Sequence, residues 1–491
     1  MTAPAPTDAT SAPQRLDPRT RLVITLLLAS AFVLILNETI MGVALSHIMT
    51  GLGIEAATAQ WVTTAFMLTM AVVIPVTGFL LQRLSTRTVY CTSMISFSIG
   101  TLICALAPSF SVLVAGRVVQ AVGTAIMMPL LMTTVMQLVP PMRRGRVMGN
   151  ISIVMSVAPA IGPAVSGLIL SVLDWRGLFW VVLPLVVAML VIGILRVPNV
   201  SEPRRLALDL PSVALSGFGF GGLIFGLSSI GESVYHPPAV SPGVPIVIGV
   251  AALVFFVLRQ RSLQRRDAAL LDLRTFTTRS FTLSVLLMLV LMGALFGTII
   301  LLPLYLQDAL GLESLATGLL LVPGGLTMGL LGPLVGRLFD AWGPRPLIMP
   351  GCTAVAIALF LMSRLDENSS SGTVLAWHVL LSVGLAFTFT PLFTSALGSL
   401  KPHLYSHGSA TIGTVQQLAG AAGTAMFVVL MVSRQVALEE QGVPEATALA
   451  TGVTGAFLAG AVLAALAVPI GALIRKPAES VDAVEDAPVA H

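Results

Sequence analysis

The sequence predicts an all-α polytopic membrane protein with 14 transmembrane helices. Hydrophobic residues make up 56% of the 491 residues and charged residues 10%, whereas soluble domains carry about 25% charged residues. Fourteen apolar stretches of 18 or more residues follow one another, each long enough to cross a bilayer as a helix. At about 20 residues each, these stretches leave no room for a sizeable soluble domain.

The first predicted helix, 22–45, follows a leader rich in Pro, Ala and Thr that carries Arg15, Arg19 and Arg21. It runs about 24 residues without a small-residue cleavage site, too long for a signal peptide, so we expect it to be retained. Thirteen further apolar stretches follow in order. The predicted spans are 22–45, 57–82, 88–107, 112–138, 147–172, 177–196, 209–231, 243–260, 280–306, 314–337, 345–363, 373–400, 408–433 and 452–474.

The chain repeats itself at an offset of 258 residues. The matched pairs are Gly53 and Gly311, Glu55 and Glu313, Pro75 and Pro333, Gly78 and Gly336, Leu80 and Leu338, and Arg87 and Arg345. Six matches in one register are hard to attribute to chance, so we expect two homologous halves with a ligand site at their interface.

The offset exceeds the length of six helices by about the length of the two helices at 209–260, which we therefore expect to be an insertion between the halves. The predicted organisation is an N-terminal tail at 1–21, a six-helix half at 22–196, two additional helices at 209–260, a six-helix half at 280–474 and a C-terminal tail at 475–491.

Basic residues in the connections predict the orientation. An even number of helices puts both termini on one side, and if that side is the cytoplasm, 22 basic residues lie inside and three, Arg176, Arg364 and Arg434, outside. This is the asymmetry of the positive-inside rule. We expect a multi-pass plasma-membrane protein with both termini cytoplasmic. Because the net charge of +4 comes from these scattered residues, we expect no nucleic-acid partner.

The energy source is constrained by what the sequence lacks. A phosphate-binding G-x-x-x-x-G-K-[ST] loop needs a lysine, and the two lysines, Lys401 and Lys476, stand in Leu-Lys-Pro and Arg-Lys-Pro. We therefore expect no use of ATP by this chain, and energy from an ion gradient or a partner subunit. The three cysteines lack metal-ligand spacing, so we expect no metal and no cofactor.

Two ionisable side chains lie clearly inside predicted helices: Glu38 and Arg117. A charge there costs at least ~2.5–3.5 kcal/mol and marks a functional site by default. Glu38 lies ~10 Å and Arg117 ~8 Å from the outer ends of their helices, so their depths agree. Apolar surroundings favour the neutral form of a carboxyl group, which suits reversible proton binding. The pair is a candidate proton-coupling site, and a structural ion pair that locks two helices is the alternative.

Two segments share a Gly/Arg pattern. The matching residues are Gly78, Arg83 and Arg87 in the first copy and Gly336, Asp340, Gly343 and Arg345 in the second. Both segments resemble the G-x-L-a-D-r-x-G-r-r motif of the major facilitator superfamily, in the inside loop between its second and third helices. Gln82 replaces the Asp of the first copy and Ser85 its second Gly. The resemblance implies that the loop Asp helps to hold the outward-facing state, which makes Asp340 the better candidate here.

Three further segments carry the resemblance. Arg117 to Gly123 is similar to the fourth-helix motif R-x-x-q-G-x-g, with Ala121 at the usual Gly. Gly162, Pro163 and Gly167 match the fifth-helix motif G-P-x-x-G-G that distinguishes antiporters from symporters. Small residues at that spacing also serve plain helix packing. Over nearly its whole length the chain looks like the fourteen-helix drug:proton antiporter branch of the superfamily.

Leu36 to Leu45 resembles the first-helix motif l-D-x-T-i-v-n-v-A-L, but Asn37 stands at the Asp position. Glu38 comes one residue later, rotated by 100° around the helix. Either Glu38 takes over the proton role from a shifted angle, or Asn37 faces the pathway and Glu38 has another part.

Candidate substrate-binding residues are aromatic, methionine, hydroxyl and amide side chains, for each of which ordinary packing is the alternative. Met and Phe adapt to varied shapes, and amides hydrogen-bond without a fixed charge. These candidates are Trp61, Thr64, Met127, Met128, Tyr305, Gln307, Phe387, Phe389, Gln416 and Gln417.

We interpret the chain as a proton-coupled antiporter that exports lipophilic cationic or neutral drugs and antibiotics by alternating access. Its partners would be these small molecules, protons and membrane lipid, and we expect a monomer. A proton-coupled importer of a small nutrient is one alternative, disfavoured by the Gly-Pro motif; a non-transporting membrane sensor is another. A membrane-embedded enzyme would need a cluster of His, Asp or Cys inside the helices, where Glu38 and Arg117 stand alone.

Overall fold

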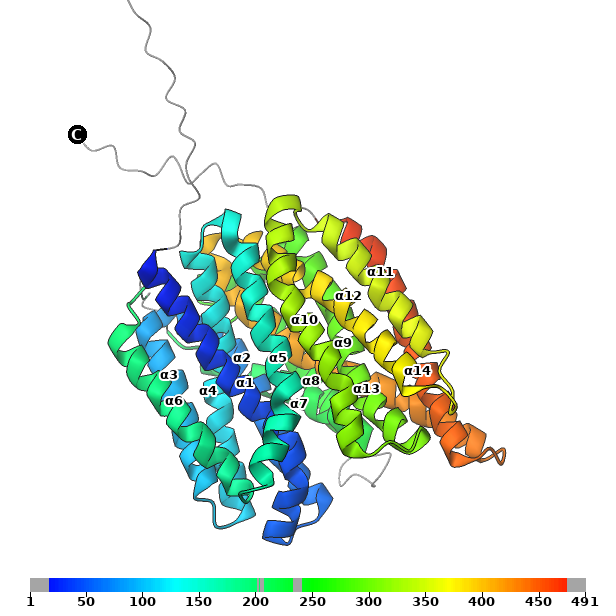
Figure 1. The fold of residues 1–491 in the computed structure, drawn as a ribbon. Helices are drawn as coiled ribbons and strands as arrows, with labels where there is room; N and C mark the ends of the chain where they lie inside the picture. The colour runs from blue at the N-terminus through cyan, green and yellow to red at the C-terminus, as the bar shows by residue number, and fades with distance from the viewer. Residues whose placement is uncertain (1–16, 201–202, 204–206, 233–240, 475–491) are drawn as a thin grey trace, which may run out of the picture.

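The computed structural model describes residues 17–200, 203, 207–232 and 241–474 and shows a bundle of long helices (Figure 1). Fourteen of these helices are long and apolar enough to cross a membrane. The described residues contain no β-strand. The predicted fold class is therefore confirmed; the predicted tails lie almost wholly outside the described residues.

The helices follow the predicted order. Their bounds are α1 (Pro18–Leu52), α2 (Ala56–Arg83), α3 (Thr86–Ala105), α4 (Phe110–Leu138), α5 (Arg144–Leu170), α6 (Trp175–Arg196), α7 (Leu210–Glu232), α8 (Gly243–Gln264), α9 (Arg279–Leu304), α10 (Ser314–Trp342), α11 (Arg345–Met362), α12 (Ser371–Gly398), α13 (Tyr405–Glu439) and α14 (Glu445–Ala472). Four short helical turns precede or extend three of them, α5, α9 and α13: η1 (Pro141–Arg143), η2 (Leu273–Thr277), η3 (Tyr305–Ala309) and η4 (Pro402–Leu404).

Several helices are longer than the apolar stretches that predict them. The helices α1 and α13 have 35 residues each, about 52 Å at 1.5 Å per residue, against a hydrocarbon core of about 30 Å. The family motif implied a loop for the segments from Gly78 to Arg83 and from Gly336 to Asp340, whereas the predicted spans 57–82 and 314–337 ended within them. Both segments belong wholly to helices, α2 and α10. Hydropathy marks where the lipid ends, whereas the helix continues for as long as its backbone hydrogen bonds do.

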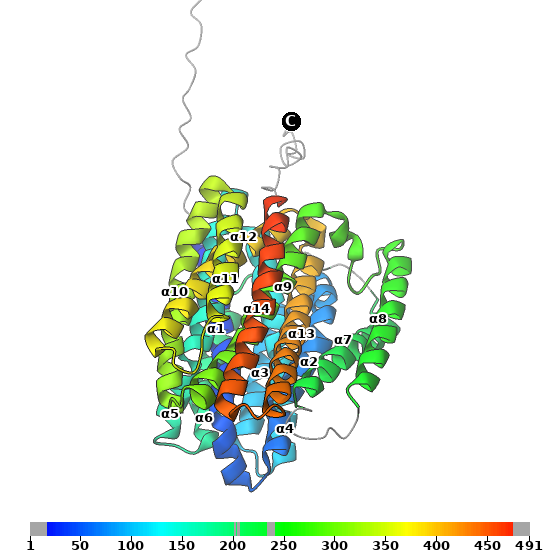
Figure 2. The ribbon, with the colours of Figure 1, turned by 90° about the vertical axis from the view of Figure 1, so that its right-hand side faces the viewer.

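The helices pack as two groups of six with a hairpin between them. Helices α1 to α6 contact one another, as do α9 to α14. The groups meet where α5 runs along α10 and where α13 packs against α2 and α4. The hairpin α7–α8 lies at the periphery, with α7 covering both α2 and α13 (Figure 2).

One end of the bundle, which we call the basic end, holds the start of α1 and the end of α14, at the top of Figure 1. It also holds the connection from α2 to α3, with Arg83 and Arg87, and the connection from α4 to α5. The connections from α1 to α2 and from α5 to α6 lie at the opposite end.

Two matched glycines of the repeat, Gly53 and Gly311, have positive φ values of 64° and 68°. Each stands at the opposite end of the bundle just before the second helix of its six-helix group. Glycine adopts this backbone without the steric cost that a Cβ brings. The match at an offset of 258 residues therefore records a shared turn.

The hairpin is held by close glycine packing along its length and by polar contacts at the basic end. A Cβ added at Gly249 of α8 would lie 2.7 Å from the backbone nitrogen of Leu223 in α7. Asp209, which directly precedes α7, accepts two hydrogen bonds of 2.7 Å from Arg259 of α8. This paired guanidinium lowers the pKa of Asp209 to about 2, so the ion pair persists over the physiological pH range.

The close packing of the hairpin is testable by substituting one methyl group. Gly249→Ala forces backbone apart and should cost about 1–3 kcal/mol of stability, lowering the thermal unfolding midpoint of the purified protein by several degrees. Gly217→Ala is the matched control, because its Cβ would meet a methyl carbon of Val72 at 3.4 Å, an ordinary contact. Equal midpoints for the two variants would contradict the packing.

Candidate functional site

A fully buried arginine joins three helices inside the first six-helix group. Arg117 of α4 is 0% exposed. Its Nη1 donates to Asn37 Oδ1 of α1 at 3.3 Å and to Gln120 Oε1 at 3.0 Å, and its Nε donates to the carbonyl oxygen of Val62 in α2 at 3.3 Å. The guanidinium carbon lies 4.0 Å from the ring centroid of Phe66. The charge is thus solvated by protein groups.

Gln120 extends this network to α3. Its Nε2 donates to Thr101 Oγ1 at 2.7 Å, and Thr101 in turn donates to the Phe97 carbonyl at 2.7 Å. The close approach of α3 and α4 needs glycine, because a Cβ at Gly100 would lie 2.5 Å from the backbone nitrogen of Gln120. Four helices therefore contribute to one buried polar cluster.

The cluster keeps two unused donors. Asn37 Nδ2 and Arg117 Nη2 are buried and have no hydrogen-bond partner among the described residues. An unsatisfied buried donor costs about 1–3 kcal/mol. The cluster is therefore able to accept one more acceptor, such as a water molecule or a carboxylate, without rebuilding its surroundings.

The structure separates the two neighbouring candidates on α1. Asn37 is 0% exposed and faces Arg117, whereas Glu38 is half-buried. No ion pair within 4 Å joins Glu38 to a basic side chain of the described chain. One turn further, an added Cβ at Gly42 would meet nothing within 4 Å. The Glu38 side of α1 is therefore open, and the Asn37 side is closed against Arg117.

The Gly-Pro segment of α5 crosses α1 beside this point. A Cβ at Gly162 would lie within van der Waals overlap of Thr39 Oγ1, so glycine permits the crossing. Ser166 Oγ donates to a carbonyl oxygen of α1 at 3.0 Å. Pro163 and Gly167 are exposed, and a Cβ at Gly167 would meet nothing within 4 Å. Gly162 is thus the member of the motif that positions α5 next to Glu38.

Asp340 connects the two six-helix groups at the basic end. Its carboxylate, in the last turns of α10, accepts hydrogen bonds from the backbone nitrogens of Gly145 at 2.8 Å and Arg146 at 2.9 Å. These amides begin α5 and have no partner within their own helix, and the helix dipole favours a negative charge there. A Cβ at Gly336 would overlap the Gly145 carbonyl oxygen, so the backbones are in contact.

Gln82 occupies the equivalent place in the other copy of the repeat. Its Nε2 lies 3.1 Å from Ser406 Oγ, 2.8 Å from His407 Nε2 and 3.3 Å from the carbonyl oxygen of His403. Asp340 thus contacts the start of α5, and Gln82 contacts the start of α13. The two contacts form a pair of clasps, one anionic and one neutral, and we call them the Asp340 clasp and the Gln82 clasp.

Deeper in the bundle, hydroxyl pairs continue the contact between the groups. Ser152 of α5 lies 2.6 Å from Thr390 of α12, and Thr133 of α4 lies 2.7 Å from Ser409 of α13, both oxygen to oxygen. All four side chains are buried. The seam between the groups is therefore sealed over the half of the bundle nearest the basic end.

The matched arginines of the repeat share one structural task. Arg87 at the start of α3 donates to the Ile194 carbonyl in the last turn of α6, and Arg345 at the start of α11 donates to the Ile474 carbonyl after α14 at 3.2 Å. Each satisfies a carbonyl at the end of the sixth helix of its group, where intrahelical partners run out.

The other motif residues also have local explanations. Gly78 allows α2 to approach α13, since its Cβ would lie 3.2 Å from His407 Nδ1. The guanidinium carbon of Arg83 lies 5.8 Å from the ring centroid of Phe79. Gly343 ends α10 with a φ of 79°, a conformation that favours glycine.

The candidate substrate-binding residues do not share one environment. Trp61 is 44% exposed and lies 6.0 Å from the Phe225 ring of α7, centroid to centroid. Met127 and Phe389 are buried, and the buried Tyr305 donates to the Asp366 carbonyl. The half-buried candidates are Thr64, Met128, Gln307, Phe387, Gln416 and Gln417. Those with partial exposure remain the better candidates for contact with a diffusing molecule.

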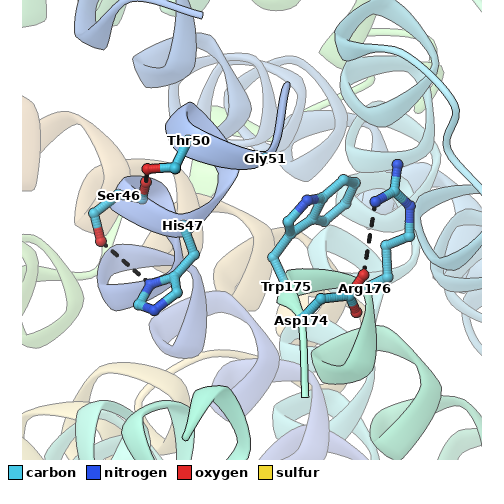
Figure 3. A pocket seen from close by; sticks show the side chains of 7 residues that line it. All are labelled: Ser46, His47, Thr50, Gly51, Asp174, Trp175 and Arg176. Carbon is cyan, nitrogen blue, oxygen red and sulfur yellow. Dashed lines mark hydrogen bonds and ion pairs between the residues drawn. The ribbon is translucent and has the colours of Figure 1, made fainter. Parts of the chain in front are cut away.

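A separate hollow of about 520 Å³ lies at the opposite end between α1 and α6 (Figure 3). Figure 3 shows His47 on one side of it and Asp174, Trp175 and Arg176 on the other. Arg176 is paired with Asp174 at 3.7 Å and donates to the Ala107 carbonyl at 2.8 Å. None of the predicted site residues lines this hollow, so we do not assign it to the site.

Within the described residues there is no group of three or more His, Cys, Asp or Glu side chains that could hold a metal ion. Gln120, Thr101 and Phe66 were not among the predicted site residues, although Gln120 stands at the q of the fourth-helix motif. Gln120 was detectable, since it follows Arg117 by three positions and residues at that spacing share a helix face. Thr101 and Phe66 carry no such pattern.

Comparison with known proteins shows which family of sequences the chain resembles. Residues 27–424 match the sequence profile of the Major Facilitator Superfamily. The chain is 41% identical over 460 residues to the lincomycin resistance protein of Listeria monocytogenes, covering 92% of this chain and 96% of that protein. It is 30% identical over 436 residues to the multidrug resistance protein B homolog of Mycobacterium tuberculosis, covering 86% and 78%.

The fold is similar to that of a human organic anion transporter known from a crystal structure. The TM-score is 0.63 and the sequence identity 17%, with 91% of this chain and 100% of that chain covered. At this identity the likeness concerns the fold alone.

The Asp340 clasp predicts the effect of removing one charge. In Asp340→Asn the amide group offers one acceptor oxygen in place of two, so about 1.5 kcal/mol should be lost and the seam should open roughly tenfold more often. The measurement is the rate at which a soluble maleimide labels Ser152→Cys in a variant whose three native cysteines are serine. Asp308→Asn, an exposed position at the opposite end, is the control. Equal labelling rates would rule out a closing role for Asp340.

Proposed function

The chain belongs to the major facilitator superfamily of membrane transporters, and we propose that it exports lipophilic cationic or neutral drugs, including antibiotics, in exchange for protons. The single observation that carries the coupling is a half-buried carboxyl group, Glu38, in the middle of a membrane-spanning helix, beside a buried arginine cluster. Membership of the superfamily does not by itself specify proton coupling, antiport or the class of substrate, and these three properties are what we propose.

The names of the relatives support export of drugs. One relative is a lincomycin resistance protein and another a multidrug resistance protein B homolog, and export is a direct route by which a membrane transporter confers resistance. The half-buried candidates Thr64, Phe387, Gln416 and Gln417 carry no charge. Such side chains suit molecules of varied shape with few fixed polar contacts.

The absence of a phosphate-binding loop from the sequence supports an ion gradient as the energy source. Glu38 is the group we assign to the proton. Asn37, the neighbour of Glu38 on α1, accepts the hydrogen bond from Arg117 of α4. Glu38 therefore lies on the open side of α1 and forms no ion pair with Arg117.

Coupling follows from competition for one carboxyl group. An antiporter must carry either a proton or a substrate through each conformational change. With Glu38 protonated the site is neutral and releases a cation; with Glu38 deprotonated it favours a cation or a hydrogen-bond donor. If the Glu38 side chain rotates, its carboxylate can accept hydrogen bonds from the unused donors Arg117 Nη2 and Asn37 Nδ2.

We assign the basic end to the cytoplasm, following the excess of arginine in its connections. The clasps then close the cytoplasmic side, and the described state is the one that faces outward. In this assignment both tails, 1–21 and 475–491, are cytoplasmic, the halves are 22–196 and 280–474, and 209–260 is the insertion. The transporter would act as a monomer in the plasma membrane.

The first test separates the energy sources and the direction of transport. In proteoliposomes with an imposed pH gradient, acidic inside, radiolabelled lincomycin or a fluorescent lipophilic cation should accumulate without ATP, and an uncoupler should abolish the accumulation. Protein-free liposomes are the control for passive partition. Strict dependence on ATP would defeat the proposal, and uptake with the opposite gradient polarity would support an importer.

The second test addresses Glu38. Glu38→Gln keeps the shape of the side chain but cannot titrate, so it should behave as a permanently protonated site. We expect loss of gradient-driven accumulation by at least roughly tenfold and a flat pH dependence of substrate binding, while binding of a neutral substrate stays measurable.

Glu440→Gln, an exposed position at the opposite end, is the matched control and should transport as the wild type does. Drug-induced proton release at the wild-type level from Glu38→Gln would move the coupling site elsewhere. Measuring proton release with a pH-sensitive dye alongside drug binding makes that outcome distinct from a folding defect.

A further inference from the structure

A groove of about 490 Å³ lies at the basic end between the last turns of α8 and the short helix η2. Its walls combine apolar side chains, Val257, Leu273 and Phe276, with the side chains of Arg261 and Arg274. A surface that is apolar on one side and cationic on the other is typical of a site for an amphiphile with an anionic headgroup.

Arg261 and Arg274 line this groove, and Arg265 and Arg266 follow just after the end of α8 without lining it. The charges of these four arginines are unequally compensated. Arg274 pairs with Asp267 and Asp272 at 2.6 Å each, so its charge is already balanced. Arg261, Arg265 and Arg266 are exposed, and their side chains make no ion pair or hydrogen bond with any other described residue. Three positive charges within six residues are therefore available to a ligand.

Hydrogen bonds join the segment that leads into η2 to the end of α8. Gln264 of α8 donates to Asp272 Oδ1 at 2.8 Å, and Gln260 Oε1 accepts from the backbone nitrogen of Leu270 at 2.8 Å. Burial alone would raise the pKa of Asp272, but the hydrogen bonds from Arg274 and Gln264 outweigh burial and hold this pKa below its usual value. Asp272 therefore stays ionised and neutralises Arg274, which leaves Arg261 and Arg265 to meet an anion.

The position of the groove favours a lipid over a dissolved anion. Helix α8 lies on the periphery of the bundle (Figure 2). Its exposed apolar side chains are Val247, Ile248, Val250, Val254, Phe255 and Leu258, a face that lies against lipid chains when the helix spans a membrane. The groove begins where this apolar face ends, which is where headgroups would lie if α8 spans the membrane. Arg261 and Arg265 stand one turn apart.

We propose that this groove binds the headgroup of an anionic phospholipid from the leaflet at the basic end. The phosphate would lie between the guanidinium groups of Arg261 and Arg265, because guanidinium binds phosphate through two parallel hydrogen bonds. The acyl chains would follow the apolar face of α8, and Phe276 and Leu273 would cover the glycerol region. The lipid would fasten the end of the inserted hairpin to the segment that leads into α9.

The test is a lipid titration of the purified full-length protein in detergent, with thermal unfolding and native mass spectrometry as readouts. Dioleoyl phosphatidylglycerol should raise the unfolding midpoint and remain bound, whereas dioleoyl phosphatidylcholine and inorganic phosphate should do neither. Each arginine near an anionic headgroup contributes about fivefold in affinity. R261Q/R265Q should therefore shift half-saturation roughly 25-fold upward.

Arg434→Gln is the matched control, an exposed arginine at the opposite end, and its titration should equal that of the wild type. Size-exclusion profiles and the single variants Arg261→Gln and Arg265→Gln show whether the double variant is folded. An unchanged half-saturation in R261Q/R265Q would overturn the proposal. So would equal stabilisation by phosphatidylcholine, which indicates general solvation, or by inorganic phosphate, which indicates a site for a free anion.

Discussion

Burial of the Arg117 charge is the constraint on which the arrangement of the first six-helix group depends. No water is available in the hydrocarbon core, so a guanidinium there must find its acceptors within the protein. The acceptors come from Asn37 of α1, the Val62 carbonyl of α2 and Gln120 of α4. Breaking a buried charge network costs several kcal/mol. The relative positions of α1, α2 and α4 are therefore set by one side chain. Because Asn37 faces inward toward Arg117, the next residue, Glu38, lies 100° further round α1 and is only half-buried.

The two copies of the internal repeat agree at positions where the backbone geometry is the same. They differ at the residues that form the Asp340 clasp and the Gln82 clasp. Gly53 and Gly311 share a left-handed turn, and Arg87 and Arg345 share the ends of the sixth helices. Gln82 and Asp340 occupy equivalent places but differ in charge. A carboxylate on two helix amides is a stronger contact than an amide on a serine and a histidine. The seam is therefore asymmetric, with its charged contact between α5 and α10.

The inserted hairpin has two structural roles. Helix α7 covers the line where α2 of one group meets α13 of the other, so any rotation of the groups must occur beneath it. At the basic end, Asp209, Arg259 and Gln260 join α7, α8 and the segment before α9. The hairpin is thus attached by side-chain hydrogen bonds at one end and by apolar packing along α7.

The sequence by itself determined the helical membrane class, the 14 spans and the family, because apolar length and motif spacing are properties of consecutive residues. It also indicated Glu38 and Arg117, since a charge in an apolar stretch is visible without a structure. Only the tertiary structure decided that Asn37, not Glu38, contacts Arg117, and that Thr101 and Phe66 belong to the same cluster. The 100° between neighbouring helix positions acquires meaning only once another helix lies on one side. Which residues share a cavity depends on contacts between segments far apart in the chain, and no local pattern encodes these.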